Sequence, residues 1–390
     1  MSRTIPAGAV RPTIAVAGGG TGGHVFPGLA VADALRALAD VDVVFVGTPR
    51  GLETRIVPPR GYPLELLDVS PMKGGGVARA VRGAAIASAA TLRAVRLVAR
   101  LRPRAVLSVG GYAAGPLALA AASLRVPVAI LEPNAAMGLA NRALFPLARR
   151  AYVAWPDLAR SGSRAQKVRV LGVPLRAGFD ASPYRASSSA RVLVLGGSQG
   201  AAALNERVPE ALARVAKDVL SLTVVHQTGE GRDDAVRAAY AREHVERVTV
   251  TPFLEDVASE LARADLVIAR AGAGAIAEIA AVGRASILIP FPHAADDHQA
   301  KNASSIAGAG GALCIRQEAA DAVRIAREVS LLLGDPDRRS GMAAAARAIG
   351  RPYAARDVAR DLLDVARIEP RPAPPRSRVN GQSAPAREAR

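Results

Sequence analysis

Short apolar segments alternate with helix-like segments along most of this chain, and this alternation restricts its fold more than any other feature. Each apolar run is short and rich in Val, Ile and Leu. Continuous apolar strands that alternate with helices are typical of parallel sheets covered by helices. The sequence therefore predicts an α/β protein. We expect strands at residues 13–17, 41–46, 105–109, 126–131, 191–195, 222–225, 248–250, 266–268 and 286–289.

Glycine-rich turns follow two of these strands, about half a chain apart. The first turn spans residues 18–23 and the second spans residues 196–201. Such a turn opens a doubly wound domain, because backbone N–H groups at a helix start approach a ligand closely only where no Cβ intervenes. The chain of 390 residues is long enough for two domains. We therefore expect two Rossmann-like, doubly wound domains.

Composition indicates where these domains begin and end. Val173-Pro174 and the Ser- and Pro-rich stretch 182–189 indicate a linker, which predicts domains at 1–174 and 175–350. A last helix is expected at 354–368. Residues 370–390 are rich in Pro, Ser and Arg and contain almost no apolar residues, so we expect a disordered basic tail there.

The positive charge is concentrated in the N-terminal half. Residues 1–174 carry 22 Lys and Arg against 8 Asp and Glu, whereas residues 175–369 carry 24 against 25. This asymmetry predicts an anionic partner, such as a membrane surface, a phosphorylated acceptor or nucleic acid. Aromatic residues make up only 3% of the chain, which argues against nucleic acid. The basic segment 79–104 fits either a core helix or a lipid-facing surface.

The first glycine turn fits two kinds of site. Its G-x-G-x-x-G spacing also occurs in NAD-binding enzymes, which need an acidic residue at the end of the second strand. Here Asp40 and Asp42 lie at the start of that strand, which disfavours an oxidoreductase. His24 follows the turn directly. It is either a general base or a structural hydrogen-bonding residue at a helix start, and the residues alone leave both open.

Three segments of the second half suit a sugar nucleotide. Ser198, in the second glycine turn, can donate to a diphosphate. Residues 270–278 combine small side chains with a helix start, and Glu278 can accept hydrogen bonds from two ribose hydroxyls. The segment 290–299 contains His and Asp residues without metal-ligand spacing, so we interpret it as a sugar-binding loop. We expect no metal and no cofactor.

In combination, these motifs resemble those of the MurG family, the bacterial N-acetylglucosaminyltransferases of peptidoglycan synthesis. The resemblance spans residues 13–368 and implies a GT-B fold, in which two Rossmann-like doubly wound domains face each other across a cleft. It also implies that residues 351–369 return to the N-terminal domain. The motifs that carry it, in order, are 18–27, 108–112, Asn134, Asn141-Arg142, 196–201, 297–299 and Asn302-Ala303.

The resemblance further implies an activity and a location. GlcNAc would move from UDP-GlcNAc to the muramyl 4-hydroxyl of lipid I with inversion, without a metal. The expected partners are UDP-GlcNAc, the lipid I acceptor and an anionic cytoplasmic membrane surface, and no nucleic acid. The protein would then be peripheral, on the cytoplasmic face of the cell (inner) membrane.

The resemblance assigns roles to individual residues. His24 becomes the favoured general base. Ser198 would contact the diphosphate, the Leu254 backbone the uracil, Glu278 the ribose and Gln299 the GlcNAc hydroxyls. The full set expected to bind UDP-GlcNAc is Thr21, Gly22, Gly23, Asn134, Arg176, Ser198, Leu254, Ala273, Gly274, Ala275, Ile276, Ala277, Glu278 and Gln299.

The chain departs from the family pattern at several positions. Pro133 stands where the family usually has Gln, Ala277 where it has a hydroxyl residue, and residues 273–275 carry few polar side chains. Beside the oxidoreductase, the alternatives are a UDP-GlcNAc 2-epimerase, another UDP-sugar glycosyltransferase and a non-catalytic, membrane-bound sugar-nucleotide sensor. The epimerase would need several carboxylates near the glycine turns, and the chain has few there.

Overall fold

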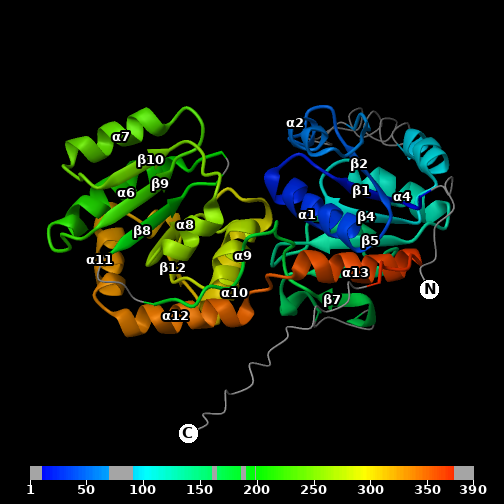
Figure 1. The fold of residues 1–390 in the computed structure, drawn as a ribbon. Helices are drawn as coiled ribbons and strands as arrows, with labels where there is room; N and C mark the ends of the chain where they lie inside the picture. Colours follow the sequence, from blue (N-terminus) through cyan, green and yellow to red (C-terminus); the bar gives the residue numbers. More distant parts are fainter. Residues whose placement is uncertain (1–10, 70–90, 160–164, 186–189, 198, 373–390) are drawn as a thin grey trace, which may run out of the picture.

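Two parallel sheets lie side by side in the computed structural model, which describes residues 11–69, 91–159, 165–185, 190–197 and 199–372 (Figure 1). The N-terminal sheet has the strand order β3-β2-β1-β4-β5-β6-β7, and the C-terminal sheet has the order β10-β9-β8-β11-β12-β13. In each sheet the strands are added first on one side of the first strand and then on its other side, which is the pattern of a doubly wound domain. The predicted fold class, two Rossmann-like domains, is therefore confirmed.

The N-terminal sheet is built from seven strands within the described residues. The helical residues 91–101 precede β4. The strands, α-helices and 3-10 helices (η) of this domain are β1 Thr13–Gly18, α1 Gly22–Leu38, β2 Asp42–Gly47, α2 Glu53–Ile56, η1 Pro58–Arg60, β3 Leu64–Leu66, β4 Ala105–Gly110, α4 Ala114–Ser123, β5 Val128–Glu132, α5 Leu139–Leu144, β6 Arg150–Val153, η2 Pro156–Ala159, η3 Ala165–Lys167 and β7 Val168–Val170.

The C-terminal sheet has six strands in the part of the chain that the structure describes. One helix, α13, follows this domain. The elements are β8 Arg191–Leu195, α6 Ala202–Ala216, β9 Thr223–Gln227, α7 Asp233–Arg242, β10 Val248–Thr251, α8 Val257–Arg263, β11 Leu266–Ala269, α9 Ala273–Val282, β12 Ser286–Leu288, η4 Ala295–Asp297, α10 His298–Gly308, β13 Leu313–Cys314, η5 Gln317–Ala319, α11 Ala322–Leu333, α12 Pro336–Ile349 and α13 Ala354–Ala366.

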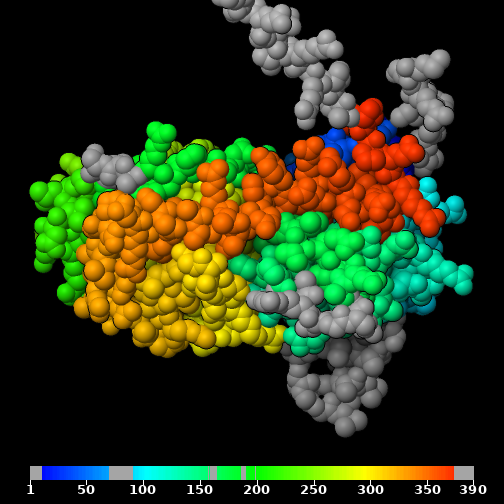
Figure 2. Space-filling view, turned by 90° about the horizontal axis from the view of Figure 1, so that it is seen from below, coloured from blue at the N-terminus to red at the C-terminus, as the bar shows by residue number. Residues whose placement is uncertain are grey.

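The helix α13 crosses from the C-terminal domain and lies along the N-terminal one (Figures 1 and 2). Its apolar side chains, among them Val358 and Leu362, are buried in one cluster with Ile14 of β1 and Leu29 of α1. The two points at which the chain crosses between domains are also adjacent, because a Cβ on Gly172 would lie 2.5 Å from the Cβ of Arg351. The last helix of the described chain therefore forms part of the core of the N-terminal domain.

All nine expected strands are present, with ends that differ by at most two residues from the prediction. Four further strands, β3, β6, β7 and β13, were not predicted. Each of these is short, and β3, β7 and β13 lie at the edges of their sheets. Short edge strands carry little apolar sequence and are therefore hard to distinguish from loops.

The two basic segments that stand out in the sequence, 79–104 and 370–390, are only partly described. Of the segment 79–104, residues 79–90 lie outside the described residues; in the helical part, Leu97 and Val98 are buried in the core, whereas Leu92 is exposed. Most of the predicted tail, 373–390, also lies outside them. At its start Arg371 contacts Asp40 in a salt bridge. Among the described residues, none of the helices has the length and apolar character needed to cross a bilayer.

Candidate functional site

The first glycine loop, residues 18–23, joins β1 to α1 at the carboxyl edge of the N-terminal sheet. β1 and β4 are neighbours, so the loop lies against Gly110 and Gly111 at the end of β4. Both of these glycines have a positive φ, +95° and +89°. A Cβ on Gly110 would lie 3.1 Å from His24 Nε2, and one on Gly111 would lie 2.6 Å from the Gly19 carbonyl oxygen. Two glycines on β4 thus make room for the loop and its histidine.

His24 is held as a neutral imidazole. Its Nδ1 atom lies 3.2 Å from the Gly19 carbonyl oxygen and 3.4 Å from Thr21 Oγ1. A carbonyl oxygen only accepts, so this contact favours the proton on Nδ1 and leaves the lone pair on Nε2. Desolvation lowers the pKa of His24 below 6.5, although the Gly19 carbonyl and the charge of Glu132 oppose that shift. At neutral pH, Nε2 can therefore accept a proton.

A buried carboxylate, which the sequence did not indicate, organises the same loop. Glu53 accepts hydrogen bonds from the backbone N–H of Gly20 at 2.7 Å and from the N–H and hydroxyl of Thr48 at 2.7 and 3.1 Å. The Glu53 carboxylate therefore already accepts a hydrogen bond from one N–H of the first glycine loop. In NAD-binding enzymes the N–H groups of this loop bind the cofactor diphosphate. This arrangement strengthens the case against an oxidoreductase. In the sequence, Glu53 is visible only as an acidic residue that follows the second strand by a few residues.

A second buried carboxylate, also missed, fixes Asn134. Glu132 ends β5 and accepts from the backbone and side-chain nitrogens of Asn134, both at 3.1 Å. Its other oxygen accepts from the Gly138 N–H at 2.8 Å and from Asn141 Nδ2 at 3.1 Å. Ser108 on β4 in turn donates to Asn141 Oδ1. The 108–112 motif and the Asn134 and Asn141 motifs of the sequence are therefore parts of one hydrogen-bonded network.

The second glycine turn is clamped by a glutamine from the neighbouring strand. Gln227, at the end of β9, accepts from the Gly197 N–H at 3.0 Å and donates to the Gly197 carbonyl at 2.9 Å. The same amide donates to the Pro252 carbonyl at 3.2 Å. This amide joins the turn to the loop that carries Leu254, which lies partly buried against the core. The expected site residue Ser198 lies outside the described residues.

The turn at the start of α9 has the expected open backbone. Gly272 precedes the helix in an extended conformation, and a Cβ on Gly272 or Gly274 would meet no described atom within 4 Å. Ala273 and Ile276 are buried, whereas Gly274, Ala275 and Ala277 are partly exposed. The N–H groups of this first turn provide positive potential without side-chain charges.

Glu278, on the α9 helix, is influenced by the charge of Arg176. Burial raises the pKa of Glu278 to about 7, and the positive charge of Arg176 partly opposes that rise. The Arg176 guanidinium is exposed and lies 3.5 Å from the Glu255 carbonyl. Glu278 can therefore change its charge near neutral pH.

The two domains meet at the starts of α9 and α10. Helix α1 contacts α9, and the charge of His298, the first residue of α10, helps to lower the pKa of His24. Gln299 follows His298, and its Oε1 accepts from the Phe291 N–H at 3.0 Å. The expected base, the α9 turn and the expected sugar-binding residue are therefore gathered from two domains. Thr21 and Gly23 are exposed and Gly22 is partly buried at the same boundary.

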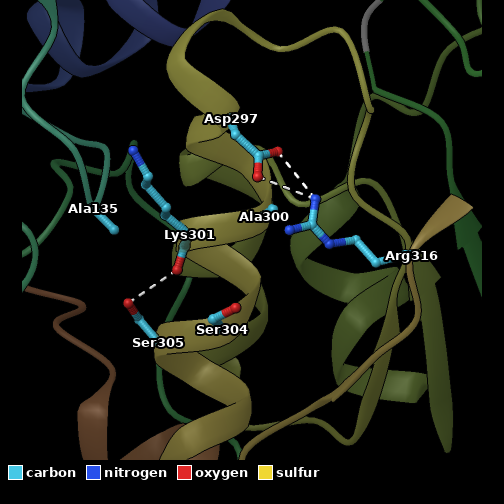
Figure 3. Close-up of a pocket in the computed structure, with 7 residues that line it drawn as sticks. All are labelled: Ala135, Asp297, Ala300, Lys301, Ser304, Ser305 and Arg316. Carbon is cyan, nitrogen blue, oxygen red and sulfur yellow. Dashed lines mark hydrogen bonds and ion pairs between the residues drawn. The ribbon is translucent and has the colours of Figure 1, made fainter.

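A separate cavity of about 300 Å3 opens on the exposed side of α10 (Figure 3). Arg316 and Asp297 form an ion pair of 3.1 Å at one end of it. None of the residues that line it belongs to the expected substrate-binding set. In the described part of the chain, no group of three or more His, Cys, Asp and Glu side chains is placed to hold a metal ion. The residues that line the cavity are Ala135, Asp297, Ala300, Lys301, Ser304, Ser305 and Arg316.

Comparison with known proteins agrees with this arrangement. Residues 14–153 match the glycosyltransferase family 28 N-terminal domain, and residues 191–358 match the C-terminal domain of that family. A protein of Sorangium cellulosum named UDP-N-acetylglucosamine–N-acetylmuramyl-(pentapeptide) pyrophosphoryl-undecaprenol N-acetylglucosamine transferase is 53% identical over 97% of this chain and 94% of its own length. A relative of the same name from Anaeromyxobacter is 43% identical over 90% and 92%.

The chain belongs to the MurG family of N-acetylglucosaminyltransferases. The crystal structure of Acinetobacter baumannii MurG matches it with a TM-score of 0.76 and 33% identity, over 91% of this chain and 99% of that one. A UDP-N-acetylglucosamine 2-epimerase matches with a TM-score of 0.60 at 15% identity, which reflects a common fold. The epimerase alternative therefore has only the architecture in its favour, whereas membership of the MurG family rests on sequence and structure together.

Proposed function

We propose that this chain transfers GlcNAc from UDP-GlcNAc to the muramyl 4-hydroxyl of lipid I, which yields lipid II. The names and the coverage of its MurG-family relatives support this activity. The observation that carries it is the neutral His24 at the domain boundary, beside the starts of α9 and α10. A base and a nucleotide-binding turn contributed by opposite domains suit the transfer of a sugar between two substrates.

In this proposal His24 Nε2 accepts the proton of the muramyl 4-hydroxyl. The deprotonated oxygen forms a bond to C1 of GlcNAc, on the side opposite UDP, while the C1–phosphate bond breaks and UDP leaves. The configuration at C1 of GlcNAc is thereby inverted. The positive end of α9 stabilises the charge that builds on the departing diphosphate, because its N–H groups point towards the start of the helix.

The proposal divides the substrates between the domains. Residues 1–174 take the acceptor, residues 175–350 take the donor, and residues 351–369 return to the acceptor domain. The donor contacts would come from Ser198 and Arg176, the Leu254 backbone, the α9 turn 273–278 and Gln299. Thr21, Gly22, Gly23 and Asn134 would complete the donor site from the other domain.

The test is release of UDP in the presence of UDP-GlcNAc and lipid I. Wild-type protein should transfer GlcNAc, and H24A should lower kcat by about a hundred- to ten-thousand-fold with an unchanged Kd for UDP, as expected for loss of a general base. The matched control is H244N, at an exposed histidine of positive φ at the end of α7, which should behave as wild type. Failure of the wild type to transfer GlcNAc would reject the activity, and a near-normal kcat in H24A would reject His24 as the base.

We also propose that the protein acts at the cytoplasmic face of the cell membrane as a peripheral protein. The support is the excess of Lys and Arg in residues 1–174 and the exposure of Arg93 and Arg96 beside Leu92. Sedimentation with vesicles tests this location. Vesicles that contain anionic lipid should bind the protein more tightly than neutral vesicles, and R93E/R96E should bind less tightly than R232E/R242E, an exposed pair in the other domain. Equal binding to both vesicle types would contradict the proposal.

A further inference from the structure

Asn302 belongs to a sequence motif to which the proposed chemistry assigns no role. Its side chain is fully buried in α10. The Oδ1 atom accepts from the Ala135 N–H at 2.7 Å, and Nδ2 donates to Asn134 Oδ1 at 3.2 Å and to the Ala271 carbonyl at 3.3 Å. Both ends of the amide are thus used.

These contacts join the two domains. Asn134 and Ala135 follow β5 in the N-terminal domain, whereas Ala271 lies just before α9 in the C-terminal domain. Figure 1 shows α9 and α10 at the side of the C-terminal domain that faces the N-terminal one. A single buried amide therefore contacts the loop that presents Asn134 and the loop that leads into the α9 turn.

The amide also determines how Asn134 is oriented. Asn134 Nδ2 donates to Glu132 Oε1, and Asn134 Oδ1 accepts from Asn302 Nδ2. With a partner on each side, the Asn134 amide has one preferred orientation. Without Asn302, Oδ1 loses its buried donor, which is costly, and the amide is held only from the Glu132 side.

We propose that Asn302 is a positioning residue that fixes Asn134 and holds the two domains in the orientation required for transfer. A continuous series of hydrogen bonds runs from Glu132 through Asn134 and Asn302 to Ala271, across the domain boundary. The kinetic part of this inference rests on the proposed transferase function. The structural part, a fixed orientation of the domains, does not.

The kinetic test compares N302A and N302D with wild type and with S304A, an exposed position on the same helix. N302A should lower kcat by about 10- to 100-fold, the range expected when a site is misplaced by about 1 Å, and leave the Kd for UDP within about twofold. N302D can still accept from the Ala135 N–H but cannot donate to Asn134, so it should resemble N302A. Wild-type kcat in N302D would overturn the assigned role of the donated hydrogen bonds.

A double-mutant cycle separates positioning from general destabilisation. If Asn302 acts through Asn134, adding N302A to N134A should change kcat by no more than about twofold, whereas independent effects would multiply. Multiplied losses would overturn the role through Asn134 and leave only the effect on domain orientation, which the distance measurement tests.

The second measurement needs no catalysis. Spin labels at L124C and L220C, in a C314A background, report the distance between exposed positions of the two domains. Wild type and S304A should give one narrow distance distribution, and N302A should give a broader one. An unchanged distribution in N302A would overturn the proposed effect on domain orientation. A broader distribution in N302A, together with a wild type that transfers no GlcNAc, would instead reject the proposed function and leave the structural inference standing.

Discussion

Individual residues around the first glycine loop depend on partners that are distant in sequence. Gly19, Gly47 and Gly51 all surround the carboxylate of Glu53, and a Cβ on any of them would lie within 2.4 Å of an atom of that side chain. Gly19 of this loop and the two glycines after the last apolar residues of β2 are therefore required for close packing against a buried charge. The pattern of glycines was visible in the sequence, but its partner was not.

This crowding predicts that G47A is destabilising. A Cβ on Gly47 would lie 2.4 Å from Glu53 Cγ and 2.8 Å from Oε1, so the carboxylate must shift away from the Thr48 and Gly20 N–H groups. We expect a loss of about 1–3 kcal/mol in the free energy of unfolding, measured with urea. G115A is the control, because a Cβ there meets no described atom within 4 Å in α4, and it should not be destabilising. Equal stability of the two variants would show that the crowding is relieved without cost.

The titration of His24 predicts the pH dependence of transfer. Desolvation lowers the pKa of His24, so the imidazole loses its proton below pH 6.5 and stays neutral above. The value of kcat/KM for the acceptor should therefore rise with pH, with the midpoint of that rise below pH 6.5. A steady-state profile from pH 5 to 8 measures this rise. An acidic limb centred above pH 6.5 would contradict the assignment of the base.

Glu278 predicts a pH dependence in donor binding. Its pKa is raised to about 7, so the carboxylate is protonated below that pH and ionised above it. An ionised carboxylate accepts hydrogen bonds from both ribose hydroxyls, so UDP should bind more tightly as pH rises from 6 to 8. Calorimetric titration of UDP at several pH values measures the effect, and E278Q should remove the dependence. A Kd that is independent of pH in the wild type would argue against the ribose contact.

At the scale of elements, the expected site residues lie mostly in the loops that follow the carboxyl ends of the strands and at the starts of the helices after those loops. His24 lies at the start of α1 after β1, Asn134 follows β5, and the α9 turn follows β11, while Gly110 at the end of β4 makes room for His24. This arrangement follows from parallel strands, whose carboxyl ends meet at the same edge of a sheet. The helix α13 has a different role, because it packs against α1 and completes the apolar core of the N-terminal domain.

The packing of α13 predicts a large effect of L362A on stability. Leu362 is fully buried against α1 and β1, so its truncation leaves a cavity in the N-terminal core. Urea unfolding should show a loss of about 2–5 kcal/mol, as for other fully buried leucines. L331A, at a half-exposed position in α11, is the matched control and should lose much less. A small effect of L362A would mean that the N-terminal core is stable without this helix.

For the whole molecule, the sequence predicted the architecture better than the site. Alternating apolar runs and two glycine turns determine two doubly wound sheets, because they reflect local periodicity. Motifs likewise indicated which loops we expect to carry the chemistry. Glu53, Glu132 and the contacts of Asn302 were not predicted, because each acts through residues that the fold brings together from other segments. A buried carboxylate has no local pattern that distinguishes it from an exposed one.

The return of α13 to the first domain has a consequence for synthesis. On the ribosome, β1 and α1 emerge first, but the helix that covers them emerges only after the entire second sheet. Throughout that interval the apolar side chains of α1 that contact Val358 and Leu362 lack their permanent cover. The strands and helices of the second domain, from β8 to α12, follow one another in the sequence, so all of them have emerged before α13 does. The core of the first domain is therefore completed only after the second domain has emerged.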